Sequence, residues 1–386
     1  MSVYELGILG AYTEKERATL TQTIGEMIAD FGLAIGTEVI VHDRAAVIGR
    51  DNRAAFAAAY FGGTPHQDEA AAREVARTNA PIIPTVNTSG DVGVQIPGFL
   101  HPFNGLRRRE RDPAMTELAV ALLECIGLLK RQRRVFVSYR RVESRTAAAQ
   151  LHDLLTARGF DVFLDTHSIR PGDPFQDVLW HRLCDSDVLV MLDTPSYFDS
   201  KWTGHELGRA RAKEIHVLRV VWPEHKPSKC TDLAETIYLE NRHLTGRDGP
   251  ILESAAEKIL LAVESLRSRS IASRYMSITG RLRAEVERIG GAVDGIGAHR
   301  AISLRLPDDQ RIWAYPVVGI PTAELLHDVA DKAWRAEQSG TPILIYDHIG
   351  IGEQWITHLK WLDDHIKSVR ALKVVESGWI LGAWEG

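Results

Sequence analysis

Cysteine is scarce in this 386-residue sequence, and its spacing offers no metal-binding pattern. Cys125, Cys184 and Cys230 lie far apart, without a CxxC pair and without a His/Cys cluster at zinc-ligand spacing. Free cysteine is among the most buried residue types in folded proteins. We therefore expect three buried thiols, no disulfide and no metal site.

Long apolar runs are also missing. No segment approaches the ~18 uninterrupted apolar residues that a membrane helix needs, and a content of 45% hydrophobic and 25% charged residues is typical of soluble globular proteins. The opening run MSVYELGILGAYTEKER has an acidic residue before its short apolar stretch and lacks the basic region of a signal peptide. These absences predict a soluble, cytoplasmic protein without a membrane partner.

The sequence has no large excess of charge of one sign. A formal net charge of −5 and a pI near 6.3 give no overall electrostatic signature of nucleic-acid binding, so a nucleic-acid partner is not expected. The phosphate-binding pattern GxxxxGK[ST] is absent, which argues against an NTPase domain. The basic run Arg107 to Arg111 is interrupted by Glu110. This favours a solvated loop, with phosphate or partner binding as the alternative.

The length of the chain predicts more than one domain, because single hydrophobic cores stop growing near ~250–300 residues. Basic or polar stretches mark the boundaries of three expected α/β domains, at residues 1–130, 131–270 and 271–386. The unit ending in PIIPTV resembles the later unit ending in HVLRVVWP, so the first domain is either a degenerate copy of the second or a regulatory domain. We expect the third domain to be a sensor or an assembly module.

The outer segments contain several local signals. ELGILGAY predicts a strand, and Thr13 and Glu16 have the spacing of a capping box that starts a helix reaching Phe31. EVIVHDR predicts a strand, and the alanine-rich stretch after it predicts a helix. In the third segment, ISLRL, RIWAYPVV, PILIYD and ALKVVE predict strands around two helices. GGAVDGIGAHR lacks the full GxGxxG pattern and predicts a turn.

The central segment contains four apolar runs: VFVSY, DVFLD, DVLVML and HVLRVVW. Each is short and apolar with almost no alternation, as strands buried on both faces are, and such strands form parallel sheets covered by helices. The intervening segments have the amphipathic pattern of helices. A flavodoxin-like doubly wound sheet is the predicted fold of this segment, flanked by two further α/β domains.

Two stretches of the central segment could carry function. The loop DTHSIRPGDPF follows a strand at the carboxyl edge of the expected sheet, where ligands of α/β sheets bind, although an ordinary connection would have the same pattern. In SKWTGHELGRARA, Trp202 and Glu206 are four residues apart and share one helix face. An indole and a carboxylate suit a cationic ligand. The alternative is a core tryptophan and a surface glutamate paired with Arg209 or Arg211.

Four motifs occur in order between Arg133 and Pro223: RRVFVSYRRVES, DVFLDTHSIRPGDPF, CDSDVLVMLDT and SKWTGHELGRA. Together they resemble a TIR (Toll/interleukin-1 receptor) domain of the bacterial, NAD-cleaving type. The resemblance covers less than a third of the chain and leaves both flanking segments unassigned. In this family the glutamate of the last motif is required for NAD cleavage, and Glu206 stands at that position, with Trp202 in the matching place before it.

The resemblance also implies further site residues. Ser138, Tyr139, Arg140 and Asp165 follow the first two strands and are expected to contact ribose or phosphate, although Asp165 could instead tether its own loop. Enzymatic TIR domains complete their site by self-association through the loop after the second strand, the BB loop. Its residues here are His167, Ile169, Arg170, Pro171, Gly172, Asp173 and Phe175.

The function implied by the resemblance is cleavage of the bond between nicotinamide and ribose in NAD⁺, which yields ADP-ribose or a cyclic ADP-ribose. NAD⁺ is then a substrate, and no cofactor is expected. The flanking domains would control this activity or bind a trigger, as in antiphage defence. The alternatives are a catalytically silent TIR scaffold for protein assembly, or an N-glycosidase acting on another nucleotide.

Overall fold

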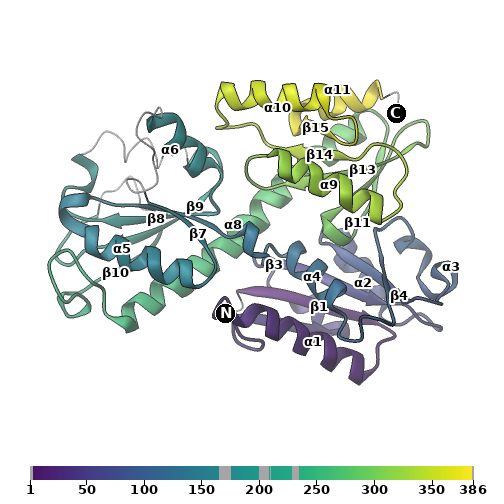
Figure 1. Cartoon of the computed structure of the whole chain (residues 1–386). Coiled ribbons are helices and arrows are strands. Elements are labelled where there is room, and N and C mark those ends of the chain that lie inside the picture. Colours follow the sequence, from purple (N-terminus) through teal and green to yellow (C-terminus); the bar gives the residue numbers. More distant parts are fainter. Residues whose placement is uncertain (1–2, 165–174, 200–207, 209, 228–233, 385–386) are drawn as a thin grey trace. The chain divides into compact units, whose positions relative to one another are not determined.

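The computed structural model describes residues 3–164, 175–199, 208, 210–227 and 234–384 (Figure 1). The chain forms two compact units. The central unit comprises Lys130–Ile271 and Ile349–Glu353, and the discontinuous unit comprises Met1–Leu129, Ala272–His348 and Gln354–Gly386. We call Met1–Leu129 the N-terminal half of the discontinuous unit and its remaining residues the C-terminal half. The division into three domains stays a prediction.

The N-terminal half is built on a parallel sheet of five strands in the order β2-β1-β3-β4-β5. The strands are β1 (Tyr4–Gly10), β2 (Val39–Asp43), β3 (Ala55–Phe61), β4 (Ile82–Asn87) and β5 (Leu106–Arg108). The helices α1 (Glu14–Ala29) and α4 (Thr116–Cys125) pack on one face, and α2 (Glu69–Arg77) packs on the other. The short helix α3 (Val92–Gln95) follows β4. The capping box of Thr13 and Glu16 is confirmed at the start of α1.

The alanine-rich stretch after β2 was predicted to be a helix, and this prediction is wrong. Its segment Ala55–Phe61 is β3, which pairs with β1 on one side and with β4 on the other. All seven residues of β3 are buried, because helices cover both faces of the sheet. The intrinsic helix preference of alanine is a fraction of a kcal/mol per residue, so burial and pairing in the middle of the sheet outweigh it.

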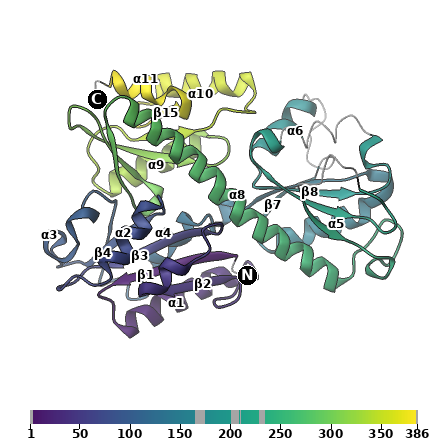
Figure 2. The same ribbon diagram turned by 180° about the vertical axis from the view of Figure 1, so that it is seen from behind.

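The central unit has a second parallel sheet, in the order β10-β9-β8-β6-β7. Its strands are β6 (Arg134–Ser138), β7 (Asp161–Leu164), β8 (Val188–Asp193), β9 (His216–Val221) and β10 (Glu235–Tyr238). The helix α5 (Arg141–Ala157) and the first part of α8 (Glu253–Arg288) cover one face, and α6 (Phe175–Cys184) covers the other (Figure 2). The predicted flavodoxin-like parallel sheet is confirmed. Counted along the chain, its strand order equals that of the N-terminal sheet, but doubly wound folds commonly share this order, so an internal repeat stays a prediction.

The C-terminal half carries a mixed sheet in the order β11-β12-β13-β14-β15. The first three strands are antiparallel and the last two continue in parallel. The strands are β11 (Ala292–Ile296), β12 (Ile302–Arg305), β13 (Arg311–Val317), β14 (Ile343–Tyr346) and β15 (Arg370–Lys373). The helices are α9 (Ala323–Arg335), α10 (Glu353–His365) and α11 (Ser377–Gly382), and the last part of α8 packs on one face of the sheet.

The run GGAVDGIGAHR, predicted to be a turn, contains the strand β11, so that prediction is wrong. Its glycines serve close packing. A Cβ atom on Gly295 would lie 2.3 Å from ring atoms of Phe103, and one on Gly297 would lie 2.2 Å from the carbonyl oxygen of Asn104. Both neighbours belong to the N-terminal half. Glycine at these positions lets the two halves of the discontinuous unit approach each other.

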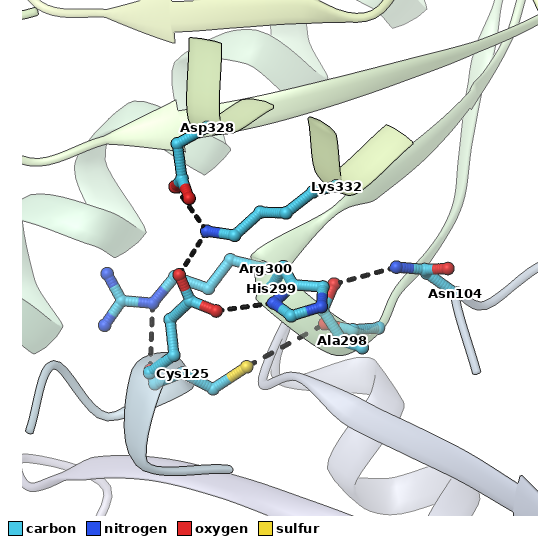
Figure 3. Close-up of polar contacts among 9 residues, drawn as sticks. Asn104, Cys125, Ala298, His299, Arg300, Asp328 and Lys332 are labelled. Atoms are coloured by element: carbon cyan, nitrogen blue, oxygen red, sulfur yellow. Dashed lines mark hydrogen bonds and ion pairs between the residues drawn. The ribbon is translucent and has the colours of Figure 1, made fainter. Parts of the chain in front are cut away.

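A buried carboxylate joins the two halves of the discontinuous unit (Figure 3). Glu124, near the end of α4, is 6% exposed, shares a hydrogen bond with His299 and makes an ion pair with Lys332 of α9. Lys332 also contacts Asp328, one turn earlier on α9, at 2.6 Å. Burial alone would raise the pKa of Glu124, but the His299 hydrogen bond and the Lys332 charge outweigh it and hold that pKa well below its usual range.

Hydrogen bonds to backbone groups reinforce this junction. The backbone N–H of Ala298 donates to the carbonyl of Asn104 at 2.8 Å, and the Asn104 amide returns a bond to the Ala298 carbonyl at 3.1 Å. The Nε of Arg300 donates to the carbonyl of Cys125 at 2.8 Å. The segment before β12 is therefore held against the N-terminal half by both backbone and side-chain contacts (Figure 3).

Two of the three cysteines lie among the described residues. Cys125 and Cys184 are buried thiols that form no disulfide among the described residues, as predicted, and Cys230 lies outside the described residues. Among the described residues, no helix combines the length and the apolar character that a membrane-crossing helix requires.

Candidate functional site

The strand order of the central unit creates a natural crevice. β7 lies on one side of β6 and β8 lies on the other, so the direction of chain progression reverses between β6 and β8. Ligands of open α/β sheets bind outside the carboxyl ends of the strands at such a reversal. Ser138 ends β6 and Asp193 ends β8, and both therefore belong to this edge.

Ser138 is a buried residue of this edge, with 1% of its surface exposed. Its Oγ accepts a hydrogen bond from the Tyr197 hydroxyl at 2.7 Å. Tyr197 belongs to the apolar cluster that also contains Phe136 and Ala210. Ser138 thus links β6 to the segment after β8, and its predicted contact with ribose or phosphate stays a prediction.

The next two predicted residues have different environments. Tyr139 is 5% exposed and packs in the core between the sheet, α5 and α8. Arg140 caps α5, where its carbonyl accepts bonds from the backbone N–H groups of Glu143 and Ser144. The Nε of Arg140 is buried and has no hydrogen-bond acceptor in the described part of the chain. Arg140 is therefore the member of this pair with unused capacity to bind an anion.

Glu143, in the first turn of α5, was not singled out from the sequence. Its Oε2 accepts a bond at 3.1 Å from the backbone N–H of Ser196, which follows β8. Burial favours the neutral form of Glu143, but contacts with Thr194 and Ser196 outweigh this effect and lower its pKa. Glu143 is consequently an anion at neutral pH that holds the segment after β8 against α5.

The sequence interpretation also missed a buried carboxylate and histidine pair. Asp193 is fully buried, and its Oδ1 lies 3.2 Å from Nε2 of His225, which follows β9. Its Oδ2 is buried and has no partner among the described residues. Burial raises the pKa of Asp193 by more than His225 and Arg219 lower it. A carboxylate at the end of an apolar strand was the available signal in the run CDSDVLVMLDT.

Most of the other predicted site residues lie outside the described part of the chain. Phe175 begins α6, but its side chain is not described. The residues outside the description are Glu206, Trp202, Asp165, His167, Ile169, Arg170, Pro171, Gly172 and Asp173. Within the described ranges, no group of three or more His, Cys, Asp or Glu side chains is arranged to hold a metal ion.

A family model described as a TIR domain matches residues 135–248, which include most or all of every strand of the central sheet. Residues 135–248 are a TIR domain. The resemblance of the four motifs to a TIR domain is thereby confirmed for the central segment. The carboxyl edge formed by Ser138, Arg140 and Asp193 belongs to this TIR domain.

Two curated proteins are similar to parts of the chain. One is a "probable 2′ cyclic ADP-D-ribose synthase BdTIR" from Brachypodium distachyon, 38% identical over 74 residues, which are 19% of this chain and 33% of that protein. The other is a "2′ cyclic ADP-D-ribose synthase BtTIR" from Bacteroides thetaiotaomicron, 25% identical over 100 residues, which are 26% of this chain and 35% of that protein. The matched region therefore spans about a third of the length of each relative.

Proposed function

We propose that the TIR domain cleaves NAD⁺ at the bond between nicotinamide and ribose. The observation that carries this proposal is the similarity of the TIR domain to two proteins named as 2′ cyclic ADP-D-ribose synthases. The sequence adds Glu206, which stands where NAD-cleaving TIR domains have their required glutamate. NAD⁺ is the substrate in this proposal, and no separate cofactor takes part.

The proposed reaction breaks the C1′–N1 bond and expels neutral nicotinamide. The ribose carbon then has the character of an oxocarbenium ion, which a nearby carboxylate stabilises. Glu206 takes this role, and the ring of Trp202 packs against the cationic nicotinamide. In hydrolysis, water adds to C1′ and releases a proton, which gives ADP-ribose. In cyclisation, a hydroxyl of the same molecule adds to C1′ and releases the proton instead.

The described part of the site supports a substrate that carries phosphate groups. Arg140 keeps a buried, unused N–H donor at the edge of the sheet, and a guanidinium is well suited to phosphate oxygens. We propose that Arg140 binds the diphosphate of NAD⁺, and that Ser138 and Asp165 contact its ribose. We also propose self-association through residues 167–175, control by the flanking segments and a role in antiphage defence.

The decisive experiment incubates the purified full chain with NAD⁺ and separates nicotinamide, ADP-ribose and cyclic products by chromatography. Glu206→Gln should lower nicotinamide release by a factor of about 100 or more, the usual cost of losing charge stabilisation in a transition state. The matched control is Glu214→Gln, because Glu214 is an exposed glutamate of the same domain, and it should retain activity.

Other outcomes favour the rival functions. Equal release by the Glu206→Gln variant would remove Glu206 from the mechanism. Absence of nicotinamide release at every protein concentration would favour a silent scaffold, and release of a base from another nucleotide alone would favour a different N-glycosidase. A rise in activity per chain with protein concentration, abolished by Asp173→Arg, would support completion of the site by self-association.

A further inference from the structure

The discontinuous unit contains a cavity of about 340 Å³ between its two halves. The N-terminal half contributes residues of β4, β5 and the segment from α3 to β5. The C-terminal half contributes the start of β13 and the residues that follow α9. Small-molecule sites usually measure about 300–1,000 Å³, so this cavity suits a small ligand. It lies outside the TIR domain.

The inner wall of the cavity is apolar and partly aromatic. Phe103 and Trp313 line it and are 8% and 9% exposed. Aliphatic side chains complete the wall, and the most buried of them are Val86, Ile96 and Leu100. Aromatic side chains offer flat surfaces on which heteroaromatic rings stack. The body of a matching ligand is therefore a flat ring.

The charged groups that line the cavity favour an anion. Arg107 and Arg311 are exposed and line the cavity, and Glu337 carries the one carboxylate among the described lining residues. Nη1 of Arg107 donates to the carbonyls of Thr88 and Gly90, at 3.3 and 2.9 Å, which fixes the position of its guanidinium. The guanidinium of Arg311 makes no hydrogen bond or ion pair with any described residue. Two guanidinium groups, one of them unoccupied, are well suited to a phosphate.

A buried amide provides the third feature. Gln338 lines the cavity, and its Oε1 accepts a hydrogen bond from the Tyr315 hydroxyl at 2.8 Å. This bond fixes the orientation of the amide. The Nε2 of Gln338 is buried and has no acceptor among the described residues. Buried donors in folded proteins are nearly always paired, so an acceptor atom of a ligand would complete this contact.

We propose that this cavity binds a nucleoside monophosphate. The base packs against Phe103 and Trp313, the phosphate lies between Arg107 and Arg311, and the Gln338 amide donates to the base or the sugar. The proposal rests on the geometry of the discontinuous unit and does not depend on NAD⁺ cleavage by the TIR domain. Because both halves of the unit contribute contacts, the bound ligand stabilises their association.

The test measures binding of AMP, GMP, CMP and UMP to the full chain by isothermal titration calorimetry. Saturable binding of at least one nucleotide is expected, with one site per chain. The corresponding nucleoside and inorganic phosphate should each bind at least tenfold more weakly, because each lacks one of the two recognised groups. Mass action should also raise the melting temperature of the chain with the concentration of the bound nucleotide.

Two variants locate the bound nucleotide. Arg311→Glu replaces an exposed cation by an anion, and Gln338→Glu keeps the acceptor for Tyr315 while replacing the buried donor by a carboxylate oxygen. Each should weaken binding at least tenfold. The control Arg53→Glu makes the same change of charge at an exposed arginine that does not line the cavity, and it should bind as the wild type does.

Clear results would overturn the proposal. It fails if none of the four nucleotides binds. It also fails if a nucleotide binds equally to the wild type, to Arg311→Glu and to Gln338→Glu, since the ligand then occupies another site. Competition by NAD⁺ in that case would assign the binding to the TIR domain. Melting temperatures of both variants without ligand, close to that of the wild type, would exclude misfolding as the cause of weaker binding.

Discussion

Each of the two units buries a carboxylate beside a histidine, and the pKa values of the two carboxylates shift in opposite directions. In the discontinuous unit, Glu124 contacts His299 and also Lys332, and its pKa is lowered. In the TIR domain, Asp193 contacts His225 and is also influenced by the charge of Arg219, yet its pKa is raised. Burial opposes ionisation in both places. At Asp193, His225 and Arg219 together do not offset desolvation, whereas at Glu124 the direct contacts with His299 and Lys332 exceed it.

The difference separates a carboxylate that stays ionised from one that holds its proton more tightly. Glu124 stays ionised and fixes one half of its unit to the other. Asp193 lies at the carboxyl edge of a parallel sheet, has an oxygen without a partner among the described residues and holds its proton more tightly than an exposed aspartate. Perturbed carboxyl groups of this kind cluster at functional sites. The predictions below test this contrast, beginning with the largest effect.

Removing the lysine should leave the buried Glu124 carboxylate beside His299 without the positive charge of Lys332. We expect Lys332→Met to lower the free energy of unfolding by about 3–5 kcal/mol, the usual cost of breaking a buried ion pair. The double variant Lys332→Met with Glu124→Gln should recover much of this loss, because position 124 then carries no buried charge. Urea denaturation of the full chain measures both. Lys360→Met, at an exposed lysine, is the control, and an equal loss in this variant would contradict the argument.

Acid should reduce the stabilisation that Glu124 gives to the fold. Because the pKa of Glu124 is lower in the folded chain than in the unfolded chain, Glu124 stabilises the fold fully at a pH above its unfolded-state pKa near 4.5. This stabilisation is lost as the pH falls toward the folded-state pKa. Below pH 4.5 the wild type should therefore lose stability faster than Glu124→Gln, by up to about 1.4 kcal/mol per pH unit for one proton. Denaturation series from pH 6 to pH 3 test this, and parallel curves would contradict it.

Removing the histidine of the second pair should raise the pKa of Asp193 further, because His225 is the main group that lowers it. We expect His225→Gln to lower the free energy of unfolding by roughly 1 kcal/mol at pH 8, where Asp193 must ionise without that partner. Carbon-13 NMR titration of the aspartate carboxyl carbons would follow the shift directly. The Asp193→Asn spectrum assigns the signal, and an unchanged midpoint would show that His225 has no influence on Asp193.

The last prediction is the one substitution that should stabilise the fold. The pKa of Asp193 is higher in the folded chain than in the unfolded chain. Ionisation of Asp193 therefore destabilises the fold at a pH above the folded-state pKa and has no effect at a pH below the unfolded-state pKa. Asp193→Asn should therefore increase the free energy of unfolding at pH 8 relative to pH 4, by an amount on the order of 1 kcal/mol. Denaturation at the two pH values measures the difference. An equal increase in the free energy of unfolding at both pH values would arise from packing, and it would contradict the difference proposed between Asp193 and Glu124.

The sequence predicted the parts of the fold that depend on neighbouring residues. The apolar runs of the TIR domain gave its parallel strands, and Thr13 and Glu16 formed the expected capping box. The predictions failed at Ala55–Phe61 and Ala292–Ile296, where composition indicated a helix and a turn. In both segments, pairing with other strands overrode a weak local preference.

The candidate site also contains residues that the sequence indicated and residues that only the structure revealed. The places of Ser138 at the end of β6 and of Arg140 at the start of α5 were predictable, because both stand in a recognisable motif, and their contacts with a substrate stay predictions. The pair of Asp193 and His225 was not, because the two residues are 32 positions apart and meet only when β8 and β9 lie side by side. Neither residue type is unusual at its place in the sequence.

The sequence by itself determined the TIR domain, through strand periodicity and the order of four motifs, both of which are encoded in short contiguous runs. The tertiary structure decided which carboxylates are buried and which groups face them. Glu124 meets His299 across 175 positions and Lys332 across 208, and the cavity of the discontinuous unit likewise combines residues from both halves. The sign of a pKa shift depends on burial and on nearby charge, and both are properties of the folded chain.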